Sequence, residues 1–142
     1  MNLYAETSAV LRWLLGAPRG EDVRTLLAQA ENVFASRLTV IEARRALVRA
    51  TVLGEIAEAS ALEAAAALSV AAARWTVVEM LPEIGERAAG RFPAEPVRTL
   101  DALHLATALF LVPEVGALSV LSTDDRIVRN VPLLGLALAL AV

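Results

Sequence analysis

The chain has 142 residues, of which 57% are hydrophobic and 4% aromatic, with a formal net charge of −3 and no cysteine. This length and apolar content predict one domain over residues 1–142 with a continuous core built mainly from aliphatic side chains. The lack of cysteine excludes disulfide bonds, a thiolate zinc site and a cysteine nucleophile. The negative charge argues against a protein that coats nucleic acid nonspecifically, but it does not exclude a nuclease.

The hydropathy pattern predicts a protein with no membrane segment. Charged residues or proline interrupt every apolar stretch before the roughly 18 residues that a membrane-spanning helix needs. The first residues, 1–4, lack the basic start and long apolar run of a signal peptide, so we expect a cytoplasmic location. The mean hydropathy of +0.59 is high, which predicts that a partner or a second copy covers apolar surface.

In chain order, short apolar runs alternate with helical patterns. The first half of the chain predicts a strand over 2–5, a helix through 15, a turn over 16–20, a helix over 21–30, a strand over 33–36, and helices over 37–53 and 55–74. The second half predicts a strand over 75–80, helices over 82–91 and 99–111, a strand over 118–121, a short helix ending at 130 and a last strand over 136–140. Strands separated by helices predict a parallel sheet covered on both faces, the three-layer α/β/α sandwich.

Four acidic residues have positions that call for an explanation. In open α/β sheets, ligands bind beyond the carboxyl ends of the strands, and Glu6 and Asp124 directly follow the first and fourth predicted strands. They would share one sheet edge if these two strands are neighbours. Glu42 and Asp101 lie inside otherwise apolar helical segments, where an unpaired buried charge is costly.

Each acid also has an ordinary structural explanation. Glu6, Asp101 and Asp124 are suited to begin or cap helices, and Asp125 is suited to the same turn as Asp124. Glu42 can pair with an arginine further along its own helix. These explanations account for the acids singly, but not for their common placement beside core-like segments.

The surroundings of these acids form four segments with distinctive sequences. They are YAETSAV over 4–10, SRLTVIEARRAL over 36–47, LDALHLATA over 100–108 and STDDRI over 122–127. In this order they resemble the motifs of the PIN-domain family, and within it those of VapC-type toxins, with the family's acids at Glu6, Glu42, Asp101 and Asp124 rather than Asp125. The third segment is the most specific, and the resemblance covers nearly the whole chain.

The resemblance implies a PIN-like α/β/α sandwich and a metal-dependent endoribonuclease, the toxin of a type II toxin–antitoxin pair. It implies Mg²⁺ or Mn²⁺ held by Glu6, Asp101 and Asp124, with Glu42 as a further ligand or as the group that orients the attacking water. Hard divalent cations choose oxygen ligands, and a metal-bound water can attack a phosphodiester. The implied partners are RNA, a cognate antitoxin and a second copy in a homodimer. The family usually has Asp at the first position, where this chain has Glu6.

Several further residues are candidates for supporting roles. Thr7, Ser8 and Ser122 are suited to orient the carboxylates, although helix capping is the simpler explanation. His104 lies three residues after Asp101 and therefore near the same helical face, where a lone histidine is more often packed and hydrogen-bonded than catalytic.

Three arginines, Arg12, Arg45 and Arg49, are candidates for contacts with RNA phosphates, because guanidinium groups bind phosphate in a forked geometry. Scattered surface arginines are the ordinary alternative for each of them.

Two other functions remain as alternatives. The fold could serve as a catalytically weak binding subunit in an antitoxin and DNA complex. It could also belong to a different Mg²⁺-dependent enzyme such as a phosphatase or phosphoacceptor domain. The second alternative lacks its expected features, because the first predicted strand ends in a single acid and the chain has no lysine.

Overall fold

The structure is a computed structural model that describes residues 1–141. Its centre is a five-stranded parallel sheet with the order β3-β2-β1-β4-β5. The strands are β1 (Asn2–Ala5), β2 (Asn32–Ser36), β3 (Thr76–Val78), β4 (Ser119–Leu121) and β5 (Ala137–Leu138). The helices are α1 (Thr7–Leu14), α2 (Gly20–Gln29), α3 (Arg37–Val52), α4 (Glu58–Ala72), α5 (Pro82–Ala88), α6 (Thr99–Val115), α7 (Asp125–Asn130) and the 3-10 turn η1 (Pro132–Leu134).

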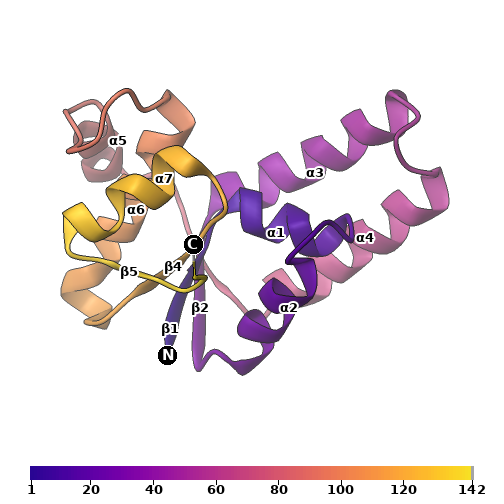
Figure 1. The fold of residues 1–142 in the computed structure, drawn as a ribbon, viewed down its shortest axis with the longest axis horizontal. Helices are drawn as coiled ribbons and strands as arrows, with labels where there is room; N and C mark the ends of the chain where they lie inside the picture. Colours follow the sequence, from indigo (N-terminus) through magenta and orange to yellow (C-terminus); the bar gives the residue numbers. More distant parts are fainter. Residues whose placement is uncertain (142) are drawn as a thin grey trace.

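The helices cover the sheet in two layers, so the predicted α/β/α sandwich is confirmed. Helices α1 to α4 lie on one face and α5 to α7 on the other (Figure 1). The central strand β1 supplies both cores by the alternation of a strand: Leu3 and Ala5 pack toward α1 to α4, and Tyr4 packs toward α5 to α7. This burial on both faces explains why the strand reads as a continuous apolar run.

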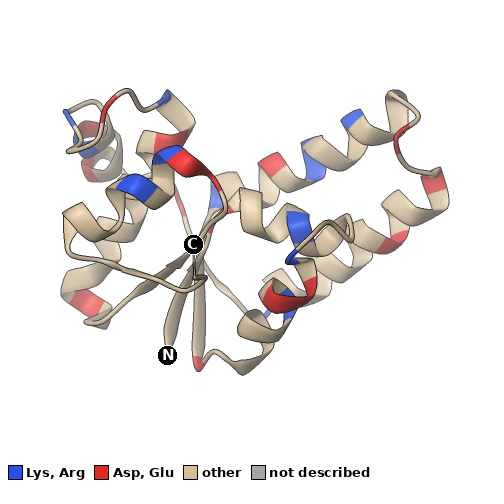
Figure 2. Ribbon diagram, in the orientation of Figure 1, with Lys and Arg blue, Asp and Glu red and all other residues tan. Residues whose placement is uncertain are grey.

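Because β1 and β4 are adjacent parallel strands, their carboxyl ends lie side by side at one edge of the sheet. Ala5 is in register with Leu121, and the backbone N–H of Glu6 donates to the carbonyl oxygen of Leu121 at 3.0 Å. The strands contain no charged residues, and the charges lie on the helices and loops around them (Figure 2). Glu6 and the loop before α7 therefore lie side by side above an uncharged sheet.

The structure departs from the predicted elements where tertiary packing or pairing decides the boundary. Helix α6 continues through Pro113 to Val115 and ends at Gly116, whose φ is 74°, whereas proline predicted an earlier end. The apolar core between α5, α6 and α7, which includes Leu111, stabilises this extension. Strand β5 has two residues instead of five, because its partner β4 has only three residues to pair with.

Helices α3 and α4 form a hairpin that extends away from the sheet (Figure 1). Large apolar side chains are exposed along it: Ile41, Val48, Val52, Leu53, Leu62 and Val70. Within residues 1–141, none of the helices has the length and apolar character needed to cross a membrane.

Candidate metal centre

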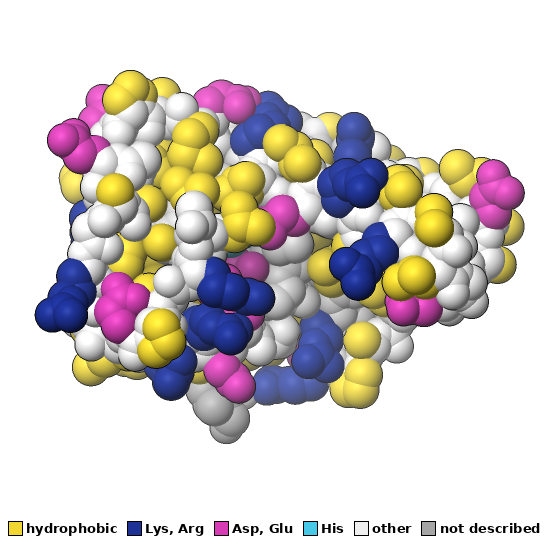
Figure 3. All heavy atoms as spheres, turned by 90° about the horizontal axis from the view of Figure 1, so that it is seen from above, with side chains coloured by type: hydrophobic (Ala, Val, Ile, Leu, Met, Phe, Trp, Pro, Cys, Tyr) yellow, Lys and Arg dark blue, Asp and Glu magenta, His cyan; other side chains and the backbone are white. Residues whose placement is uncertain are grey.

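All four predicted acids line one pocket at the carboxyl edge of the sheet. Figure 3 looks down on this edge and shows acidic side chains in a central hollow, with basic side chains beside them. The pocket is lined by Glu6, Thr7, Ser8, Leu11, Glu42, Arg98, Thr99, Leu100, Asp101, His104 and Asp124. These residues come from α1 and α6 with their N-cap residues, from α3 and from the loop after β4, so only the folded chain brings them together.

Glu6 is a buried carboxylate that caps α1. Its Oε2 accepts hydrogen bonds from the backbone N–H of Ser8 at 3.1 Å, from the Ser122 hydroxyl at 2.7 Å and from the Ser8 hydroxyl. The Ser8 hydroxyl also accepts the backbone N–H of Thr123 at 2.9 Å. This network connects the start of α1 to the loop after β4 and fixes the direction of the Glu6 side chain.

Glu42 is held by a network of hydrogen-bonded polar side chains, most of them buried. Its Oε1 accepts hydrogen bonds from the Thr7 hydroxyl and from Nε2 of His104, both at 2.7 Å. The other ring nitrogen of His104, Nδ1, lies 2.9 Å from the hydroxyl of Tyr4. With Nε2 donating to a carboxylate, Nδ1 is the ring nitrogen available to accept from the Tyr4 hydroxyl.

Burial and hydrogen bonds decide which of these side chains are charged. Burial by itself raises the pKa of Glu42, but hydrogen bonds from His104 and Thr7 outweigh it and hold the pKa below its usual value. Burial, helped by the negative charge of Glu6, raises the pKa of Tyr4 well above its usual value. Glu42 is therefore an ionised acceptor, and Tyr4 is a neutral donor.

Asp101 and Asp124 each cap a helix and both contact Arg98. Asp101 Oδ2 accepts from the backbone N–H of Arg98 at 3.3 Å and from Arg98 Nε at 3.1 Å. Asp124 Oδ1 accepts from the backbone N–H of Arg126 at 2.9 Å, and its Oδ2 lies 3.5 Å from Arg98 Nη2. The guanidinium group thus bridges the two carboxylates.

The oxygen atoms of this pocket suit a hard divalent cation. Each acid uses one oxygen for the hydrogen bonds that orient it. The second oxygens are Glu6 Oε1, Glu42 Oε2, Asp101 Oδ1 and Asp124 Oδ2. Among residues 1–141, the only hydrogen bond donated to any of these second oxygens is the one from Arg98 to Asp124 Oδ2. In the described chain no buried side-chain oxygen or nitrogen lacks a hydrogen-bond partner. The second oxygens without a donor must therefore be open to the pocket, where Mg²⁺ or Mn²⁺ would find them.

The acids share a pocket but do not form a closed ligand set. Across residues 1–141, no three histidine, aspartate or glutamate side chains are close enough together to hold a metal ion as they stand. The contacts of Arg98 with Asp101 and Asp124 lie within this pocket. A divalent ion would thus require a rearrangement of these side chains.

The profile of the PIN-domain family matches residues 3–132. The chain belongs to the PIN-domain family. This PIN domain is 31% identical over 135 residues to Ribonuclease VapC46 of Mycobacterium tuberculosis, a match that covers 95% of this chain and 94% of that protein. The resemblance of this chain to the PIN-domain family is confirmed.

Solved structures have the same fold. VapC20 of Mycobacterium tuberculosis, described as a toxin that cleaves the sarcin-ricin loop, matches with a TM-score of 0.64 and 18% identity over 89% of this chain and 93% of that one. PAE2754 of Pyrobaculum aerophilum matches with a TM-score of 0.59 and 16% identity over 92% of this chain and 79% of that one. The five-stranded sandwich of this PIN domain is therefore the fold of these proteins.

The remaining predicted residues of the PIN domain lie in different places. Thr7, Ser8 and Ser122 all donate hydrogen bonds to pocket carboxylates. Arg45 and Arg49 are exposed on α3, and Arg12 lies half-buried in the last turn of α1. None of the three arginines lines the pocket, and neither does the exposed Asp125.

Sequence reasoning missed Arg98 and did not foresee the contacts of His104. Arg98 is the N-cap of α6, three residues before Asp101, and a charged residue at a position that usually carries Ser, Thr, Asp or Asn is a signal that could have revealed it. His104 also had a signal, since it lies one helical turn after Asp101. Its partners Tyr4 and Glu42 are distant in sequence, so only the fold identifies them.

Proposed function

We propose that this PIN domain is a Mg²⁺- or Mn²⁺-dependent endoribonuclease of the VapC toxin type. The observation that carries the proposal is the convergence of four acids on one pocket at the sheet edge, each with one oxygen held by the protein. The relative named Ribonuclease VapC46 supports RNA as the substrate. A bound divalent ion would supply an activated water and stabilise the negative charge that develops on the phosphate.

We assign ion binding and water orientation to different acids of the pocket. Glu6, Asp101 and Asp124 are the proposed ligands, through their oxygens that face the pocket. Glu42 is ionised and aimed by Thr7 and His104, so it is suited to accept a hydrogen bond from the attacking water or to bind the ion as well. The serines that hold Glu6 keep the longer side chain at this position in one orientation.

The first experiment compares the chain in EDTA with the chain in Mn²⁺ or Mg²⁺. We expect cleavage of a labelled RNA only with the ion, together with a higher melting temperature, since an ion that binds only the folded state stabilises it. At a hundredfold excess over the dissociation constant the gain is about 2.7 kcal/mol, which moves the melting temperature of a domain this size by several degrees. Ion uptake without cleavage would favour the binding-subunit alternative. No response to either ion would contradict the proposed function.

The proposed RNA contacts outside the pocket involve Arg12, Arg45 and Arg49. Arg45 and Arg49 follow Glu42 along the exposed side of α3, so a strand that enters the pocket can reach them. Replacing both with alanine should weaken RNA binding and reduce the slope of log affinity against log salt by about 0.7 for each phosphate that the protein no longer neutralises. Filter binding at several salt concentrations measures this, with Arg24→Ala on α2 as the control. Unchanged affinity and slope would show that these arginines do not bind RNA.

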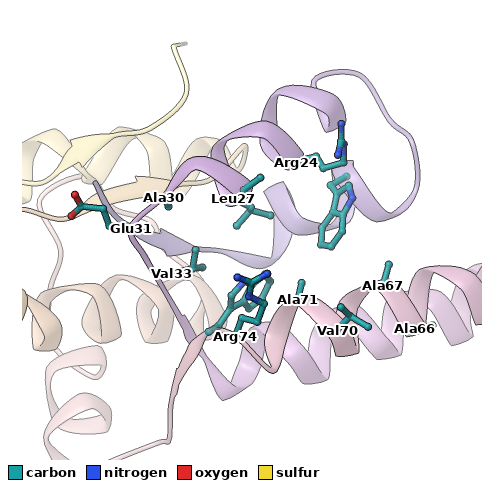
Figure 4. A pocket seen from close by; sticks show the side chains of 13 residues that line it. Arg24, Leu27, Ala30, Glu31, Val33, Ala66, Ala67, Val70, Ala71 and Arg74 are labelled. Atoms are coloured by element: carbon teal, nitrogen blue, oxygen red, sulfur yellow. The ribbon is translucent and has the colours of Figure 1, made fainter.

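We assign the chain two protein partners, a cognate antitoxin and a second copy of itself, with the cytoplasm as their location. The exposed apolar side chains of α3 and α4 support a covering partner. A second apolar surface supports the same conclusion: a pocket between α2 and α4, where Leu27 and Arg74 lie on opposite sides (Figure 4). Neither surface contains any of the four acids, so a partner can bind there while the acid pocket stays open.

A further inference from the structure

Arg98 has a combination of contacts that ordinary helix capping does not require. Its guanidinium group contacts two different acids of the pocket, Asp101 through Nε at 3.1 Å and Asp124 through Nη2 at 3.5 Å. The capping contact at this helix start joins the Asp101 carboxylate to the backbone N–H of Arg98 and does not use the guanidinium group. The side chain therefore serves the two carboxylates and not the helix end.

We propose that Arg98 is a built-in competitor cation, which bridges Asp101 and Asp124 and must withdraw from them before a divalent ion can bind. This inference rests on the proposed function, because it takes these two acids as ligands. According to this proposal, Arg98 controls how readily the divalent ion binds.

The two cations cannot share this position. A Mg²⁺ ion binds carboxylate oxygens at about 2.0–2.1 Å in an octahedral shell. Arg98 Nη2 lies 3.5 Å from Asp124 Oδ2, a proposed ligand oxygen, and Arg98 Nε contacts Asp101 Oδ2, beside the Oδ1 that is open to the pocket. An ion between Asp101 and Asp124 would lie within a few ångströms of a group of like charge. Repulsion and crowding thus make the two bound states mutually exclusive.

Arg98 is able to withdraw without disturbing the fold. Its side chain is 64% exposed, whereas those of Asp101 and Asp124 are 7% and 21% exposed. The preceding connection is fixed by the buried Asn130, whose side chain exchanges two hydrogen bonds with the backbone of Ala94 at 2.8 and 3.0 Å. The backbone therefore stays in place while the long side chain moves toward solvent.

The competition should be modest in size, because an exposed arginine holds its partners weakly. Arg98→Ala removes the guanidinium group but retains the backbone N–H that Asp101 caps. We expect Mn²⁺ to bind this variant roughly three- to tenfold more tightly than the unchanged protein. Arg98→Lys keeps the charge without the fork, so it should lie between the two.

Calorimetric titration of Mn²⁺ into the metal-free proteins measures this, with thermal melts in EDTA and in Mn²⁺ as a second readout. The matched control is Arg24→Ala, which makes the same change in net charge by breaking an exposed pair with Glu21 on α2. Tighter binding and a larger Mn²⁺-induced rise in melting temperature for Arg98→Ala alone support the proposal. If Arg98→Ala binds Mn²⁺ no more tightly than the unchanged protein and Arg24→Ala do, the proposal about Arg98 is overturned, whereas the proposed metal site stands. Absence of Mn²⁺ binding in every protein overturns the proposed function together with the inference.

Discussion

Asp101→Asn should reduce RNA cleavage by at least about a hundredfold, since even changes to residues that only support metal ligands cost 10- to 100-fold in metal affinity or activity. Asp101 is the acid of the most specific motif, and its Oδ1 is open to the pocket. An amide is a neutral and weaker ligand for a hard cation than a carboxylate. The Mn²⁺-induced rise in melting temperature should shrink with the activity.

The metal-free stability separates this role from helix capping. The asparagine oxygen can still accept the backbone N–H of Arg98, and the ion pair that the substitution removes involves a largely exposed arginine, so the free energy of unfolding should change by about 1 kcal/mol or less. Asp125→Asn is the matched control, because Asp125 is exposed and lies outside the pocket. A strongly destabilised metal-free Asp101→Asn protein that still binds Mn²⁺ and cleaves RNA would show that Asp101 is only a cap.

The order of elements could be predicted because each of the first four strands is a short, mostly apolar run that ends at or just before a polar or charged residue. Leu3, Tyr4 and Ala5 are completely buried, which produces the continuous apolar pattern of a central parallel strand. The prediction that Glu6 and Asp124 share an edge depended on β1 lying beside β4, which the structure confirms. Pairing between strands more than a hundred residues apart leaves no mark in either strand's own sequence.

The boundaries and contacts that sequence reasoning missed depend on distant parts of the chain. Proline at 113 predicts an earlier end of α6, and only the packing of Leu111 into a core shared with α5 and α7 explains the continuation. The structural explanations of Glu6, Asp101 and Asp124 as helix caps are also correct. Capping and pocket lining are thus properties of the same side chains, since helix starts at the carboxyl edge point their N–H groups toward the pocket.

His104→Phe should have the largest effect on stability among the substitutions considered. His104 is 2% exposed and both of its ring nitrogens have partners. Phenylalanine fills a similar space but leaves the buried Tyr4 hydroxyl without its acceptor and removes one of the two donors to Glu42, so that only Thr7 still donates to it. The unpaired hydroxyl costs about 1–3 kcal/mol and the lost hydrogen bond to the Glu42 carboxylate about 1.5–3 kcal/mol. We therefore expect a loss of about 2–4 kcal/mol and a melting temperature lower by roughly 10 °C.

The same substitution tests whether His104 positions Glu42 for the reaction. Measured well below the melting temperature, cleavage should fall by about 10- to 100-fold, the usual effect of losing a residue that orients a metal-site carboxylate. His104→Gln places an amide donor near the position of Nε2 and should recover much of the activity. Tyr4→Phe removes only the hydroxyl that contacts Nδ1, so it should lower stability while the Nε2 contact with Glu42 preserves most of the cleavage. Full activity in folded His104→Phe would mean that Glu42 is held by Thr7 alone, and that His104 contributes to the core and not to the reaction.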